Sequence, residues 1–157
     1  MDLKLYRFSP ITTKEELLQA IGYVATKTTK LCNKVIDEEF PIEPLTIFSH
    51  YPTEFENLKK ILFELGSQTI EVNGPYVKLH SPIQLPHNKL ENLRIRQPDP
   101  YRIQVGCNDF VVPDYEAFKR KYLTNKPNNL RLIQRPEYDM IEFFDPDFDV
   151  LAYVVSN

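Results

Sequence analysis

The order of secondary-structure signals repeats along the 157-residue chain, and this repeat limits the folds that the chain can adopt. Pro52 opens the helical pattern of one block, and Pro113 opens that of the next, roughly 60 residues further on. In each block a strand-like run precedes the helix and three strand-like runs follow it. One such module alone would leave a face of its sheet bare, so we predict that two modules, residues 45–100 and 101–157, pack together.

The first block starts with a strand-like run at residues 45–50 and continues with a helix that ends at Gly66. Asn73-Gly74 predicts a hairpin turn in the part that follows. The segment SPIQLPHNKLEN, rich in proline and polar residues, predicts a loop. The three strands after the helix are expected at residues 69–72, 76–79 and 93–96.

The second block repeats this order with clearer signals. A strand-like run at residues 102–112 precedes a short helix over residues 114–123, with Asp114 as its N-cap. Turns rich in proline and aspartate separate the remaining runs. The last three strands are expected at residues 130–134, 140–144 and 150–155.

Residues 1–44 lie outside the repeat. They predict a short strand at residues 3–8 and a long amphipathic helix that begins at the Thr13/Glu16 capping box and runs to about Asp37. The apolar stripe of this helix favours a role in covering the open side of the sheet, and a homodimer contact is the alternative. The fold class we predict is α+β, a single domain over residues 1–157 with two βαβββ modules, curved mixed sheets and an N-terminal strand and helix.

Composition excludes some classes of partner. The formal net charge of -3 and the pI of about 5.6 give no reason to expect nucleic acid or an anionic membrane. No run approaches the roughly 20 apolar residues of a membrane span. Cys32 and Cys107 have no disulfide-framework or zinc-site spacing, and the N-terminus does not look like a signal peptide. A cytoplasmic location is therefore expected.

Two stretches of the second block resemble a known superfamily. QVGCNDFVVPDYEAFKRKY is similar to the first strand and helix of a module in the vicinal oxygen chelate superfamily, which includes glyoxalase I, bleomycin-resistance proteins and extradiol dioxygenases. MIEFFDPDFDVLAYVV is similar to the closing hairpin of such a module. The resemblance covers residues 45–155. It implies half-open cups whose concave faces hold the site and whose convex faces are covered by helices.

The resemblance also implies metal ligands at inward positions of the first and last strands, and these positions have changed. Cys107 stands where a histidine is usual, and Ala152 where a glutamate is usual. The first module has Thr46 at the corresponding position of its first strand and offers Arg94 and Arg96 on its last strand. A methyl group, a hydroxyl and guanidinium groups cannot build a divalent metal site, so we predict no metal and no cofactor.

Period-two alternation assigns the strand faces of the second module. It directs Cys107 and Asp109 into the cup, and Phe110 and Val112 toward the helix, although it also places polar Asn108 on the helix side. For the last strand we expect Leu151 and Tyr153 toward the helix and Val150, Ala152 and Val154 in the cup.

The candidate site residues each have a structural alternative. Arg94 and Arg96 share a strand face and suit an anionic ligand, or they form surface ion pairs with Asp99, Glu137 or Asp139. Cys107 suits a nucleophile, although a buried cysteine is more often a small hydrophobic residue.

The acidic and histidine candidates also remain open. Asp109 is a candidate base or ligand contact, or else the partner of an arginine across the sheet. Glu142 is a general base if it faces the cup and has no such role if it is exposed. His50 ends a strand and is expected near the cup mouth.

These residues lead to three functional hypotheses. The first is a metal-independent binder of a small organic anion or aromatic compound, of the glyoxalase/bleomycin-resistance type. The second is a lyase or isomerase with an acid/base site or a non-standard metal, for which Glu142, Asp109 and Cys107 are the catalytic candidates. The third is an interaction domain with a filled cup. The ligand-binding residues expected are Arg94, Arg96, Cys107, Asp109, Glu142 and His50.

Overall fold

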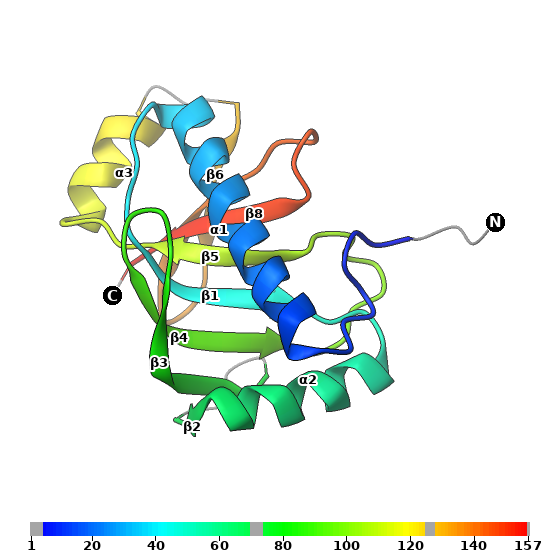
Figure 1. Ribbon diagram of the computed structural model, residues 1–157. Coiled ribbons are helices and arrows are strands. Elements are labelled where there is room, and N and C mark those ends of the chain that lie inside the picture. Colours follow the sequence, from blue (N-terminus) through cyan, green and yellow to red (C-terminus); the bar gives the residue numbers. More distant parts are fainter. Residues whose placement is uncertain (1–4, 70–73, 125–127, 157) are drawn as a thin grey trace.

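The computed structural model describes residues 5–69, 74–124 and 128–156 (Figure 1). Within these ranges the chain forms three helices and one eight-stranded sheet. The helices are α1 (Lys14–Ile36), α2 (Pro52–Leu65) and α3 (Tyr115–Leu123). The strands are β1 (Ile42–Phe48), β2 (Gly66–Gln68), β3 (Tyr76–Gln84), β4 (Lys89–Arg96), β5 (Gly106–Phe110), β6 (Leu130–Gln134), β7 (Asp139–Phe143) and β8 (Val150–Val155).

Both modules have the same internal topology. The strand order across the sheet is β2-β3-β4-β1-β5-β8-β7-β6. In each module the first strand pairs parallel with the last, β1 with β4 and β5 with β8. The modules meet where β1 pairs antiparallel with β5. The predicted α+β class with two βαβββ modules in a curved mixed sheet is therefore confirmed.

Helix α1 covers the sheet where the two modules meet. The Thr13 side chain accepts a hydrogen bond from the Glu16 backbone N–H at 3.1 Å, as the capping box predicted, and Asp37 ends the helix in the left-handed conformation. The buried side of α1 packs on β1, β5, β7 and β8, and Figure 1 shows the helix crossing β1, β5 and β8. The favoured role of the apolar stripe, covering the sheet, agrees with this packing.

The other two helices extend the same layer. Helix α2 packs on β2, β3 and β4, and Pro52 occupies the start of the helix, where a missing N–H costs nothing. Phe118 of α3 lies 6.3 Å from the ring of Phe143, which in turn meets Phe110 at 5.6 Å. All three helices therefore cover the same face of the sheet. No helix of the described ranges has the length and apolar character needed to cross a membrane.

The N-terminal segment does not form the expected strand in its described part. Residues 5–8 form bends, and the Tyr6 hydroxyl donates to the Pro100 carbonyl at 2.9 Å. Buried Glu54 of α2 accepts a hydrogen bond from the Ile11 N–H at 2.6 Å and another from the Ser9 hydroxyl. Side-chain contacts thus hold this segment where a strand ladder was expected.

The region after α2 also differs from the expectation. Strand β2 begins at Gly66 itself, and a Cβ there would lie 2.3 Å from the Lys78 carbonyl oxygen, so the close β2–β3 approach requires glycine. Residues 70–73, which include most of the strand expected at 69–72 and Asn73 of the expected turn, lie outside the described residues. The segment predicted as a loop instead continues β3 to Gln84 and starts β4 at Lys89. Pro82 lies within a register shift of β3, and Pro86 lies in the turn between the two strands.

Asn108 has a partner on the helix side. The Thr28 hydroxyl lies within hydrogen-bonding distance of Asn108 Oδ1 and, at 2.8 Å, of the Val24 carbonyl oxygen in its own helix. Both side chains are buried. The polar residue that conflicted with the predicted strand face therefore fastens α1 to β5.

Replacement of Thr28 with valine should destabilise the protein by about 1–3 kcal/mol, because it leaves the buried Asn108 carbonyl oxygen without its donor. The measurement is chemical unfolding of T28V. The matched control is T26V, since Thr26 lies exposed on the same helix and should change stability by no more than about 0.5 kcal/mol. Equal effects of the two substitutions would contradict the role given to this contact.

Candidate functional site

A pocket of about 480 Å³ lies on the sheet face opposite the helices. Its volume is within the range of about 300–1,000 Å³ that small-molecule sites occupy. Strands of both modules line it, because β1 and β4 contribute to one side and β5 to β8 to the other. The lining residues are Thr46, Phe48, Arg94, Arg96, Arg102, Cys107, Asp109, Arg131, Ile133, Arg135, Tyr138, Met140, Glu142, Tyr153 and Val155.

The pocket brings together five of the six predicted site residues, namely Arg94, Arg96, Cys107, Asp109 and Glu142. His50 lies elsewhere, beneath the N-terminal segment. Its ring stacks on Tyr6 with centroids 3.9 Å apart, and its Nε2 is 3.1 Å from the Gln104 carbonyl oxygen. Burial lowers the pKa of His50. Its buried ring packs against the N-terminal segment and does not line the pocket.

One polar row crosses the junction of the modules. Thr46 is the cross-strand neighbour of both Arg94 and Cys107, and Arg94 Nε donates to Thr46 Oγ1 at 3.0 Å. Burial raises the pKa of the Cys107 thiol to about 12, although Arg94 acts in the opposite direction. A thiol with this pKa is protonated at neutral pH and is a poor nucleophile, in line with its structural alternative.

A second polar row crosses the second module. Glu142 is 4% exposed and forms an ion pair with Arg131 on β6. The Tyr153 hydroxyl of β8 donates to its other oxygen at 2.9 Å. Because both carboxylate oxygens already have partners, Glu142 is poorly placed to act as a general base.

Asp109 stands at the end of this row, next to Tyr153 across the β5–β8 pair. Burial raises the pKa of its carboxyl group from 3.8 to about 6, while the charge of Arg94 lowers it. A carboxyl group that titrates near neutral pH can both accept and release a proton. Of the three catalytic candidates, Asp109 is therefore the one suited to proton transfer.

Two arginines of the pocket stack on aromatic rings. The Arg96 guanidinium lies 4.8 Å from the centroid of Phe48, and the Arg131 guanidinium lies 5.1 Å from that of Phe144. Phe48 and Phe144 belong to one small cluster that also contains Cys107, Leu151 and Tyr153. Stacking holds the planar groups in place and leaves the N–H donors at their edges for an acceptor such as a carboxylate.

Positive charge dominates the pocket, since five arginines line it against two carboxylates. Within residues 5–69, 74–124 and 128–156, no ion pair involves Arg96, Arg102 or Arg135. Within the described residues Arg96 therefore forms no ion pair with Asp99, Glu137 or Asp139, the surface partners expected as its alternative. One of them, Asp139, pairs instead with Lys119 at 3.6 Å.

The face assignment expected for the last strand is wrong. Val150, Ala152 and Val154 are fully buried on the helix side, and Tyr153 and Val155 line the pocket. The cause is the parallel pairing with β5, in which Cys107 lies beside Leu151 and Asp109 beside Tyr153, so that these residues share a face. Ala152, the position at which the resemblance implies a glutamate, therefore faces α1.

Several pocket residues were not among the predicted site residues, including Arg102, Arg131, Arg135 and Tyr153. Tyr153 was assigned to the wrong face of its strand. Every residue of β8 except Tyr153 is apolar. Alternation alone therefore did not show which face of β8 is turned toward the helices. A pairing argument from Glu142 would have found it, because residues opposite each other on antiparallel strands project to the same side.

The donors in the pocket do not fit a divalent metal. The described residues contain no group of three or more His, Cys, Asp or Glu side chains that could hold an ion. Glu142 is occupied by Arg131 and Tyr153, and the Cys107 thiol remains protonated. Arg94, hydrogen-bonded to Thr46, adds a positive charge beside these positions.

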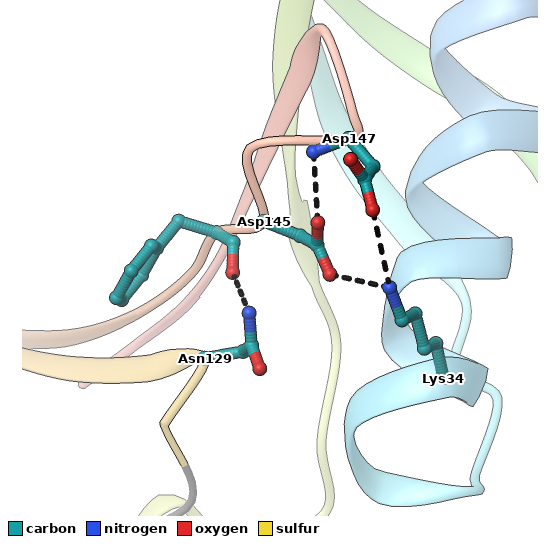
Figure 2. A network of polar contacts seen from close by, with 5 residues as sticks. Lys34, Asn129, Asp145 and Asp147 are labelled. Carbon is teal, nitrogen blue, oxygen red and sulfur yellow. Dashed lines mark hydrogen bonds and ion pairs between the residues drawn. The ribbon is translucent and has the colours of Figure 1, made fainter.

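The hairpin between β7 and β8 is fixed to α1 by a network of polar contacts (Figure 2). Lys34 Nζ lies 2.7 Å from Asp145 Oδ2, and the Asp147 N–H donates to Asp145 Oδ1 at 2.8 Å. The Asn129 amide donates to the Phe144 carbonyl at 2.8 Å. The hydrogen bond from Lys34 lowers the pKa of Asp145. These contacts position Phe144, on which Arg131 stacks.

Comparisons with known proteins agree with the fold and add nothing on activity. No family model and no curated protein matches the chain. One similar solved structure is described as "Structural Genomics, Protein EC4020". It superposes with a TM-score of 0.66 over 98% of this chain and 92% of that chain, at 13% sequence identity. At this identity the likeness supports a shared fold alone.

Replacement of Asp109 with asparagine should stabilise the protein at neutral pH. The folded protein binds the Asp109 proton more tightly than the unfolded chain, so this contribution is complete below the ordinary pKa of 3.8 and is lost as the pH rises through about 6. The stability of D109N relative to wild type should therefore increase by about 2 kcal/mol from pH 4 to pH 7.5. Urea unfolding across this range measures it, and a constant difference would contradict the raised pKa.

Both thiols should be unreactive in the folded protein. Burial raises the pKa of Cys32 and of Cys107 to about 12, so little thiolate exists at pH 8. We expect reaction with a thiol-specific disulfide reagent at least about 100-fold slower than in denaturant, where both cysteines react. Rapid labelling of native C32A would show that Cys107 is more reactive than its burial implies.

Proposed function

We propose that the protein binds a small organic anion in the arginine-lined pocket, without a metal ion, as a glyoxalase/bleomycin-resistance-like protein whose metal positions have changed. One observation carries the proposal: five arginines surround a pocket of about 480 Å³, and Arg96, Arg102 and Arg135 form no ion pair within the described ranges. Guanidinium groups recognise carboxylate and phosphate through paired hydrogen bonds, which fits such a ligand.

The arrangement of the arginines supports binding of an anion at one end of the pocket. Arg96 and Arg131 stack on Phe48 and Phe144, which pack against the same small cluster. Arg102, from the segment between β4 and β5, lines the same pocket. Because stacking restricts the guanidinium groups before binding, less conformational entropy is lost when an anion binds.

The open volume favours a ligand site over an interaction domain with a filled cup. A homodimer remains a prediction from the sequence. The expectation that the protein binds neither nucleic acid nor a membrane also remains a prediction. The cytoplasmic location has the same status.

A lyase or isomerase activity is the second candidate, and Asp109 favours it. Its carboxyl group lies in the pocket with a pKa of about 6, as a proton-transfer residue requires. Deuterium exchange from D2O into a 2-oxo acid such as phenylpyruvate, followed by NMR, tests this activity. Exchange above the uncatalysed rate with wild type, and its loss in D109N, would support an enzyme. Equal rates with both proteins would leave binding as the function.

Benzoate should raise the melting temperature and bind with measurable heat, whereas its neutral isostere benzamide should do neither. The reason is that charge-assisted hydrogen bonds to arginine each contribute about 1.5–3 kcal/mol. R96Q and R102Q should therefore each weaken benzoate binding by about 10-fold or more. Thermal shift and calorimetry measure these changes. The ionic strength is kept low, because salt ions would screen the attraction between the arginines and benzoate.

R120Q is the matched control, because Arg120 lies exposed on α3 outside the pocket. It should bind benzoate as wild type does. Equal binding of benzoate and benzamide, or equal loss in R96Q and R120Q, would contradict the proposed site.

A further inference from the structure

The second module presents its pocket side chains in bands along the strands. A charged row crosses β6, β7 and β8, and an apolar row follows two residues further along each strand. The strand register pairs Arg131 with Glu142 and Glu142 with Tyr153. It also pairs Ile133 with Met140 and Met140 with Val155. All six side chains line the pocket.

The apolar row differs from the protein core. Ile133, Met140 and Val155 are only partly buried, and they lie on the pocket side, away from the helices. These three residues belong neither to the main core nor to the partly buried residues that pack against it. Apolar side chains on a pocket wall are the usual lining for the carbon skeleton of a small ligand.

We infer that the ligand is an amphipathic monocarboxylate, with its carboxylate at the end of the pocket lined by Arg96, Arg102 and Arg131. Its apolar body lies against Ile133, Met140 and Val155, beyond which Arg135 follows the end of β6. This inference rests on the proposed function and specifies the class of ligand. The charge of the pocket selects the anionic head, and the adjacent row selects the body. Glu142, already paired with Arg131, separates the two without offering a free charge.

The strand geometry sets the length of the body. Two residues along a strand correspond to about 7 Å, so a body of about six carbons extends from Arg131, the arginine of the charged row, across the apolar row. Met140 is unbranched and adapts to ligands of different shape, which allows either an aliphatic or an aromatic body.

A series of acetate, butanoate, hexanoate and octanoate tests the inference by calorimetry. Affinity should increase about fourfold for each added methylene up to hexanoate and more slowly beyond it. In M140Q, which keeps the side-chain length, the gain from butanoate to hexanoate should fall from about 16-fold to less than threefold, while butanoate affinity stays within about twofold. V155T is a second, independent variant with the same expectation.

F63Q is the control for a general loss of apolar surface, since Phe63 is exposed on α2 outside the pocket. It should retain the full chain-length dependence. If butanoate binds and R96Q weakens it, but longer chains bind no better, the apolar subsite is wrong and the anion site remains. Tighter binding of octanedioate than of octanoate would overturn the inference in favour of a second anionic subsite. If no carboxylate binds to wild type, the proposed function also fails.

Discussion

The antiparallel pairing of β1 with β5 is the contact on which the rest of the structure depends. It joins two modules, each of which pairs its first strand with its own last strand, into one sheet. The approach is close at Gly106, where a Cβ would lie 2.3 Å from the Thr46 carbonyl oxygen and 3.1 Å from a methyl group of Val24 in α1. A glycine is thus needed for both the strand pairing and the helix packing at this point. Without this junction the pocket would have only one wall.

Burial of one sheet face decides the character of the other. Helix α1 covers the junction through apolar contacts and the Thr28–Asn108 contact, so alternate residues of the same strands must project to the opposite side. Those residues include charged groups, whose burial without partners would be costly. The structure satisfies them in different ways: Glu142 is buried with two partners, and Arg96 and Arg131 stack on rings and remain partly exposed.

The sequence was informative where its patterns had two clear sides. The repeated element order predicted both modules, and alternation placed Cys107 and Asp109 on the face that carries the pocket. It failed on β8, because a nearly all-apolar strand has no polar side to give its direction, and only the pairing with β5 sets its face. It also failed for residues 5–8, which form bends where Tyr6 hydrogen-bonds to the Pro100 carbonyl, followed by the contacts of Ser9 and Ile11 with Glu54. His50 looked accessible because no local pattern reveals that Tyr6 stacks on it.

The positions at which the resemblance implies metal ligands carry Thr46, Cys107 and Ala152, and arginines line the pocket. This changes the source of positive charge in the pocket. A divalent metal would attract anions to the pocket only after its ligands had lost their protons. Here five arginine side chains supply the positive charge directly. Asp109 is the pocket carboxyl group that titrates near neutral pH, and it loses its negative charge as the pH falls through about 6. Because that charge would repel a bound anion, affinity for a strong-acid anion, which stays ionised, should rise as Asp109 becomes protonated, and the ligand should in turn raise the Asp109 pKa.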